Sequence, residues 1–162
     1  MQEKVILQPK KTKKYEIIDA DGVSTGEYIE FDFEMIEYPL LLQKANDMHY
    51  KNKEWIRNQF VAIDRQKDYT KKGKFLSNNE ELKIKAVSEY CDKEEKVIDL
   101  IFGVGTTKKM LNGRKKYYEM YDDIMESLDK IMPSVNNYVD GITKDIKKKY
   151  SSKKNVGVLS ED

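Results

Sequence analysis

The fold is decided by residues 117–146, YYEMYDDIMESLDKIMPSVNNYVDGITKDI, in which apolar side chains recur at alternating steps of four and three residues. The main apolar row consists of Tyr117, Tyr121, Ile124, Leu128, Ile131, Val135, Tyr138 and Ile142. A second row follows beside it every seven residues, at Tyr118, Met125, Met132, Val139 and Ile146. Three apolar positions in seven residues are typical of a helix with a wide buried face. The pattern therefore predicts a long helix that needs a large apolar surface to cover it.

A glycine-rich segment, Gly103-Val104-Gly105-Thr106-Thr107, precedes this helix. Gly103 follows a run of helical character, so we expect it to end that helix in the left-handed conformation. Thr106 or Thr107 can cap a short helical turn, which Asn112-Gly113 closes. A phosphate loop would need two glycines five residues apart, a Lys-Ser/Thr pair and a preceding strand, so this spacing does not fit one. We predict a structural turn between helices at Gly103, Gly105 and Thr106.

Two further helices are predicted upstream of the glycines. Residues 40–68 contain neither glycine nor proline. Pro39 suits the first turn of a helix, where its missing N–H costs nothing. Ser77 followed by Glu80 forms a capping box, which predicts a second helix from about residue 79 to residue 102.

The turn Asp21-Gly22 separates two runs of strand-like composition, 15–18 and 27–33. Asp-Gly is a strong signal for the turn of a β-hairpin. An isolated hairpin is barely stable in water, so this one should pack on the helices or on a neighbouring subunit. The sequence therefore predicts a mainly α fold, in which an amino-terminal β-hairpin packs on a bundle of about four helices.

The same patterns set the expected boundaries. A flexible, lysine-rich arm is expected over residues 1–14, followed by a single domain over 15–150. Within that domain we expect the hairpin at 15–33 and the helical part at 35–150. Residues 151–162 contain no aromatic side chain and have little to bury, so we expect a disordered tail there.

The final helix should begin near Arg114 and contains Pro133. A proline inside a helix removes one backbone hydrogen bond and clashes with the preceding turn. The apolar period nevertheless continues through Pro133 without a change of phase. We therefore expect either a kinked helix or two helices that meet at this residue.

Composition narrows the classes of function. Thirty basic and twenty-nine acidic side chains give a net charge of +1, and only three of the basic residues are arginine. Nucleic-acid binding rests on excess cations and prefers arginine for bidentate contacts, so the composition argues against it. Cys91 is the single cysteine, and no apolar run has the length of a signal-peptide core or a membrane span. We expect a cytoplasmic protein without a membrane or nucleic-acid partner.

No group of residues indicates an active site. His49 is the only histidine, with no cysteine partner for a zinc site and no nucleophile at helical spacing. We expect His49 to be half-exposed on a helix and Cys91 to be a small buried side chain. Asp19 and Asp21 resemble a fragment of a calcium loop without its later ligands. Solvated helix faces explain the acidic pairs Glu94-Glu95 and Asp122-Asp123. The sequence therefore predicts no catalytic residue, no metal and no cofactor.

Tyrosine is unusually frequent, with eleven residues in the chain, and five of them fall on predicted packing faces. Tyrosine buries a large ring and keeps a polar group, which suits reversible protein interfaces. An ordinary core with polar edges explains the same pattern equally well. The candidate partner-binding residues are Tyr117, Tyr118, Tyr121, Met125 and Met132.

The order of these features resembles a known family. The segment 101–113, IFGVGTTKKMLNG, is followed by an aromatic-rich helix that reaches Met132-Pro133. This layout is similar to the tail assembly chaperones of tailed bacteriophages that infect Gram-positive hosts. In those proteins a Phe-Gly-x-Gly-Thr segment precedes a small helix, a glycine and a helix that ends in an aliphatic–proline pair. The resemblance covers residues 15–140, and Phe102–Thr107 is its most specific part.

The resemblance implies a protein that is not an enzyme and has no catalytic residues. Such chaperones are thought to coat the long helical tape-measure protein, keep it soluble and leave as the tail tube polymerises around it. The expected location is then the cytoplasm of the bacterial host, and the expected partners are the tape-measure protein and further copies of the chain. Two other readings stay open: a small helical DNA-binding or regulatory protein of phage origin, and a small enzyme in which a carboxylate converges on His49.

Overall fold

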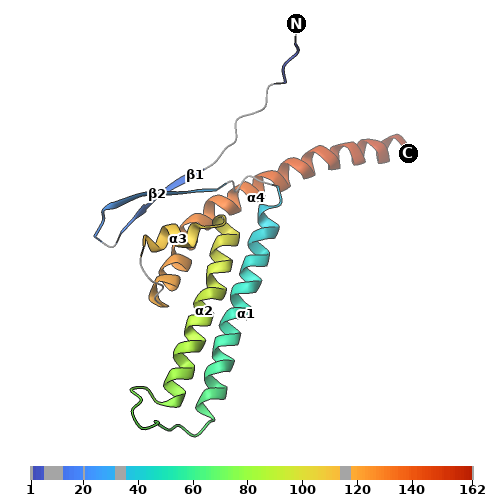
Figure 1. The fold of residues 1–162 in the computed structure, drawn as a ribbon. Coiled ribbons are helices and arrows are strands. Elements are labelled where there is room, and N and C mark those ends of the chain that lie inside the picture. The colour runs from blue at the N-terminus through green and yellow to red at the C-terminus, as the bar shows by residue number, and fades with distance from the viewer. Residues whose placement is uncertain (1, 6–12, 20, 32–35, 114–117, 162) are drawn as a thin grey trace.

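The computed structural model describes residues 2–5, 13–19, 21–31, 36–113 and 118–161 (Figure 1). Over this part of the chain it confirms the predicted mainly α fold, with an antiparallel hairpin followed by four helices. The elements are β1 (Lys13–Ile18), β2 (Ser24–Phe31), α1 (Tyr38–Asp64), α2 (Asn78–Phe102), α3 (Thr106–Leu111) and α4 (Tyr118–Glu161).

The hairpin starts two residues before the predicted boundary. Lys13 pairs with Phe31 and Lys14 with Glu30, so both lysines belong to β1 rather than to the expected arm. In the turn, Asp19 accepts hydrogen bonds from the backbone N–H groups of Asp21 and Val23, each at 2.9 Å from its Oδ1. The aspartate that resembled part of a calcium loop therefore acts as a turn-forming side chain.

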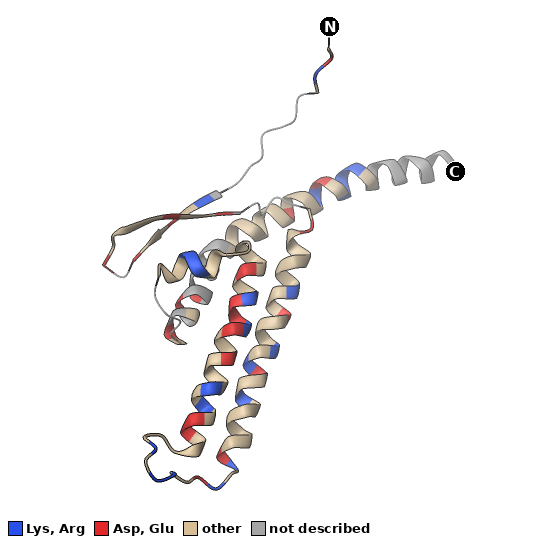
Figure 2. Cartoon of the chain, in the orientation of Figure 1, with Lys and Arg blue, Asp and Glu red and all other residues tan. Residues whose placement is uncertain are grey.

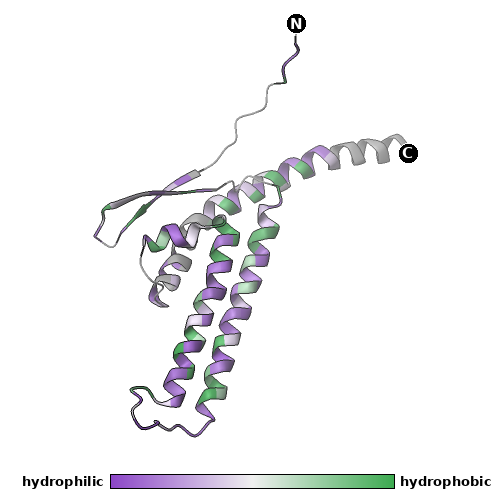
Figure 3. Ribbon diagram, in the orientation of Figure 1, coloured by the Kyte–Doolittle hydropathy of each residue, from purple (hydrophilic) through white to green (hydrophobic). Residues whose placement is uncertain are grey.

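Helices α1 and α2 form a long antiparallel pair joined by the loop 65–77 (Figure 1). The predicted capping box is present, because the Ser77 hydroxyl accepts from the Glu80 N–H and the Glu80 carboxylate accepts from the Ser77 N–H. Helix α1 ends at Asp64, four residues before the predicted end. Hydrophobic and hydrophilic residues alternate along both helices, as one buried and one exposed face require (Figure 3).

The core is centred on the carboxyl half of α2, where Val97 and Ile98 are fully buried. Cys91 is also buried there, as predicted. The hairpin packs against this core through Ile29. Tyr38 links the start of α1 to the end of α2, because its hydroxyl donates a hydrogen bond to the Ile101 carbonyl at 3.1 Å. Burial raises the pKa of Tyr38, with Tyr15 adding to the effect, so this hydroxyl keeps the proton that it donates.

Helix α4 is one helix with Pro133 inside it, so of the two expected arrangements the structure has the single helix. It also continues to Glu161, through the segment 151–161 that was expected to be a disordered tail. That segment contains no proline, and its one glycine, Gly157, opposes a helix by only about 1 kcal/mol.

Candidate protein-binding site

The glycine turn that links α2 to α3 is present, but the two glycines have different roles from those predicted. Gly103 has a positive φ of 115° with an extended ψ of 153°, so it is not the left-handed helical residue. That conformation belongs to Gly105, at φ 88° and ψ −2°. The Thr106 hydroxyl donates to the Gly103 carbonyl at 2.7 Å. Glycine is favoured at both positions because other residues rarely adopt a positive φ.

Asp99, in the last turn of α2, fixes the direction of α3. Its Oδ1 accepts from the Thr107 backbone N–H at 3.0 Å and from the Thr107 hydroxyl at 2.9 Å, and its Oδ2 accepts from the Gly105 N–H at 3.2 Å. Sequence reasoning missed Asp99. A carboxylate one helical turn before a glycine turn with exposed N–H groups is the signal that would have identified it.

A groove lies between this turn and β2, and we call it the hairpin–turn groove. Its buried part is formed by Ile29 and Phe102, and its more exposed lining includes Tyr28 and Val104. Val104 projects into solvent with 99% of its surface exposed. The groove encloses about 460 Å³, and the charged residues along it are Lys14, Glu27, Glu30 and Lys109. Exposed apolar side chains with charged residues of both signs beside them are typical of a protein-binding surface.

The candidate residues on α4 do not form one surface. Tyr121 is only 1% exposed, so it belongs to the core and cannot contact a partner directly. Burial raises the pKa of its hydroxyl, as expected for a ring enclosed by the bundle. Tyr118 is partly exposed, with its ring 6.1 Å from that of Tyr90, and Met132 is half-buried. Tyr117 and the Met125 side chain lie outside the described part of the structure.

The apolar face of α4 passes from buried to exposed along its length. Val135 is 2% exposed, Val139 and Ile142 are half-buried, Ile146 is 45% exposed and Tyr150 is 63% exposed. We call Ile142, Ile146 and Tyr150 the distal row. In Figure 1 this part of α4 extends away from the α1–α2 pair, and the fold therefore leaves the distal row partly uncovered.

A buried polar cluster joins α1 to α2, and the sequence did not predict it. The Glu94 side chain is completely enclosed, with Oε2 at 2.7 Å from His49 Nδ1 and Oε1 accepting from Asn52 Nδ2 at 3.0 Å. The expectation that Glu94 lies on a solvated face is wrong, and His49 is more buried than expected. Glu94 sits four residues after Tyr90 and three before Val97, so the apolar period itself places it on the buried face.

The cluster of His49, Asn52 and Glu94 is relevant to the hypothesis that the protein is a small enzyme using His49. A carboxylate does converge on His49, as that hypothesis required. Both carboxylate oxygens are already hydrogen-bonded, however, and no part of Glu94 is open to a substrate. A buried carboxylate needs such partners simply to be tolerated in the core. The arrangement is accounted for by the packing of α1 against α2.

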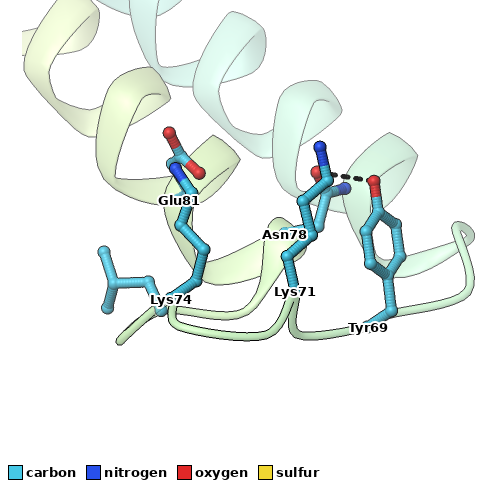
Figure 4. Close-up of a pocket in the computed structure, with 6 residues that line it drawn as sticks. Tyr69, Lys71, Lys74, Asn78 and Glu81 are labelled. Atoms are coloured by element: carbon cyan, nitrogen blue, oxygen red, sulfur yellow. Dashed lines mark hydrogen bonds between the residues drawn. The ribbon is translucent and has the colours of Figure 1, made fainter.

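A small notch lies at the opposite end of the pair, in the loop between α1 and α2. Figure 4 shows Tyr69, Lys71 and Lys74 on the loop, with Asn78 and Glu81 at the start of α2. The Tyr69 hydroxyl donates to the Asn78 side-chain oxygen at 3.3 Å. The notch encloses only about 50 Å³, enough for an ion or a water molecule but not for a peptide side chain of ordinary size.

Among the described residues, no three His, Cys, Asp or Glu side chains are grouped so that they could hold a metal ion. In the same part of the chain, the helices contain no stretch that combines the length and the apolar character needed to cross a bilayer. The Cys91 thiol is buried in the core.

Comparison of the chain with protein-family models, curated protein sequences and solved structures gave no match in any of the three. The function is therefore argued from the chain's own residues.

Proposed function

We propose that this protein is a phage tail assembly chaperone that binds the helical tape-measure protein and keeps it soluble during assembly of the tail tube. The observation that carries the proposal is the distal row of α4. One face of a single helix is core at Val135 and more than half exposed at Tyr150. A face of this kind is suited to a second amphipathic helix, which would continue the packing that the bundle begins.

The chemistry of the surface supports a protein client. The distal row is apolar, and an aspartate and a lysine lie beside it at Asp145 and Lys147. An apolar centre with a charged rim is the usual composition of a reversible protein interface. A net charge of +1 gives the whole chain little attraction for nucleic acid.

The choice of a tape-measure client rests on the family resemblance. In the structure, the residues that carry the resemblance build the junction between α2 and α3: Phe102 is core, and the two glycines and Thr106 form the turn. Such residues preserve a fold rather than a contact surface. The client would therefore bind to α4, and the glycine segment would stabilise the helical bundle from which α4 extends.

The test is co-expression with fragments of a tape-measure protein, followed by measurement of the soluble fraction of each fragment. Wild-type protein should raise that fraction and co-purify with the fragment. The double variant Ile146→Glu, Tyr150→Glu should lose both effects, because two charges would be buried at the helix interface. Both positions are already exposed, so the variant should remain folded and keep the circular dichroism of the wild type.

A matched control places the same residue type on the opposite face of the same turns of α4. Lys144→Glu, Lys148→Glu lies about half a turn from the distal row and should keep client binding. Equal loss in both variants would show that charge, and not the apolar row, is responsible. Failure of the wild type to solubilise any fragment, together with salt-sensitive binding of DNA, would favour the regulatory reading instead.

A further inference from the structure

The loop that joins α1 to α2 is strongly basic. Residues 65–76, which we call the basic tip, contain five lysines and arginines and one aspartate, for a net charge of +4. Next to three of these lysines, Phe75 is 95% exposed. A fully exposed phenylalanine beside Lys71, Lys72 and Lys74 presents an apolar group surrounded by cations at the end of the molecule.

The basic tip is held in one conformation by hydrogen bonds at its base. Asp68 accepts from the Ser77 hydroxyl at 2.7 Å and from the Asn79 N–H at 3.0 Å. The Asn79 side chain in turn donates to the carbonyls of Ile63 and Gln66, each at 3.1 Å. A loop that is already ordered loses little conformational entropy when it binds. The tip is therefore suited to enter a preformed hollow.

The opposite end of the molecule has the complementary properties. The hairpin, residues 13–31, contains five acidic and two basic side chains, for a net charge of −3. Figure 2 shows acidic residues along the hairpin and basic residues in the loop at the far end of the α1–α2 pair. The hairpin–turn groove lies on this acidic end, and its exposed apolar side chains are Tyr28 and Val104. Its volume of about 460 Å³ exceeds the roughly 150 Å³ of a cavity that holds benzene.

We propose that copies of this chain associate head to tail, with the basic tip of one copy docked in the hairpin–turn groove of the next. The Phe75 ring would pack against Tyr28 and Val104, the exposed apolar side chains of the groove, and the tip lysines would approach Glu27 and Glu30 on β2. Lys14 and Lys109 also line the groove, so its own charge is balanced, and the attraction comes from the excess of acid on the hairpin as a whole.

The position of the two surfaces determines the kind of assembly. They lie at opposite ends of α2, whose 25 residues span about 37 Å. An interface between two different surfaces leaves one of each open, so association continues until a ring closes or a filament forms. A row of identical copies would repeat the distal row of α4 at regular intervals.

The experiment is sedimentation velocity of the full-length protein over a range of concentrations. Wild-type protein should grow in mass with concentration and dissociate in high salt. The tip variant carries Phe75→Asp with Lys71→Glu, Lys72→Glu and Lys74→Glu; the groove variant carries Tyr28→Asp with Val104→Asp. Each variant alone should bind itself at least about tenfold more weakly than the wild type. All six positions are exposed, so both variants should keep the wild-type helix content.

Mixing the two variants gives the decisive measurement. The tip variant keeps an intact groove and the groove variant keeps an intact tip, so one productive contact remains between them. The mixture should form a complex of one copy of each and should not grow further. The control Lys144→Glu, Lys147→Glu, Lys148→Glu makes the same change in lysine charge on α4 and should associate as the wild type does.

Several outcomes would overturn the proposal: a wild type that stays monomeric at every concentration, a mixture that forms no complex, or a control that dissociates as the tip variant does. Binding of the tip to vesicles of anionic phospholipid without self-association would assign it to a lipid surface instead. None of the tip and groove substitutions touches the distal row, so failure here leaves the proposed client binding to be judged separately.

Discussion

The buried Glu94 carboxylate joins α2 to α1 through hydrogen bonds with His49 and Asn52. Removal of one partner from a buried ionic cluster leaves the other partners enclosed without a hydrogen bond. Glu94→Ala should therefore lower the free energy of unfolding by about 3–5 kcal/mol, measured from urea denaturation. The control is Glu89→Ala, at an exposed position of the same helix, which should change it by less than about 0.5 kcal/mol. Equal effects would mean that the cluster contributes nothing specific.

Asp68 gives the basic tip a defined dependence on pH. The hydrogen bonds from the Asn79 N–H and the Ser77 hydroxyl lower the pKa of its carboxyl group. Because the pKa is lower in the folded protein, the stabilisation is complete above the unfolded value, about 3.9, and is lost as the pH falls through the folded value. The protection factor of the Asn79 amide, which is its intrinsic exchange rate divided by the observed rate, should therefore fall as the pH is lowered from about 5 to about 2.

The matched variant for that experiment is Asp68→Asn, which cannot ionise. Its tip should be less protected than the wild type at neutral pH and should show no further loss of protection in acid. A wild-type tip whose protection is unchanged across the same range would contradict the role given to Asp68.

At the scale of elements, replacing each of two glycines by alanine should change the stability of the protein in opposite directions. Gly105 has φ of +88° and Gly141 lies within α4, and a Cβ added at either would meet no atom within 4 Å. Gly105→Ala should destabilise the protein by about 1–2 kcal/mol through backbone strain alone. Gly141→Ala should stabilise it by about 0.5–1 kcal/mol, because alanine favours the helix. Thermal unfolding of the two variants tests both signs, and a stable Gly105→Ala would refute the turn geometry.

The elements themselves could be predicted because their signals are local. The helix period, the capping box at Ser77 and the Asp21-Gly22 turn each lie within a few residues, and each is present in the structure. The cluster of His49 with Glu94 joins positions 45 residues apart, and no local pattern shows which helices meet. Tyr150 is exposed because the neighbouring helices do not extend far enough to cover it. The apolar pattern of α4 carries no information about where those helices end.

At the scale of the whole molecule, charge is balanced in total but not in distribution. The hairpin is acidic and the basic tip is cationic, and the long α1–α2 pair separates them (Figure 2). The overall charge of +1 therefore hides an acidic hairpin and two basic segments, the basic tip and residues 143–154 of α4. The prediction that the protein does not bind nucleic acid rested on the net charge of the whole chain. A locally basic segment such as the tip could still attract phosphate groups, so binding of DNA should be measured at the tip.

The buried Cys91 thiol can be used to measure how often the core of the protein opens to solvent. It is the single thiol in the chain and lies in the core beside the residues that hold α2 in place. A thiol reagent should modify native protein slowly and urea-unfolded protein at once, so the labelling rate measures how often the core is exposed. Glu94→Ala should label faster than wild type, and a client bound along α4 should slow labelling. No engineered probe is needed to follow the chain through a cycle of client capture and release.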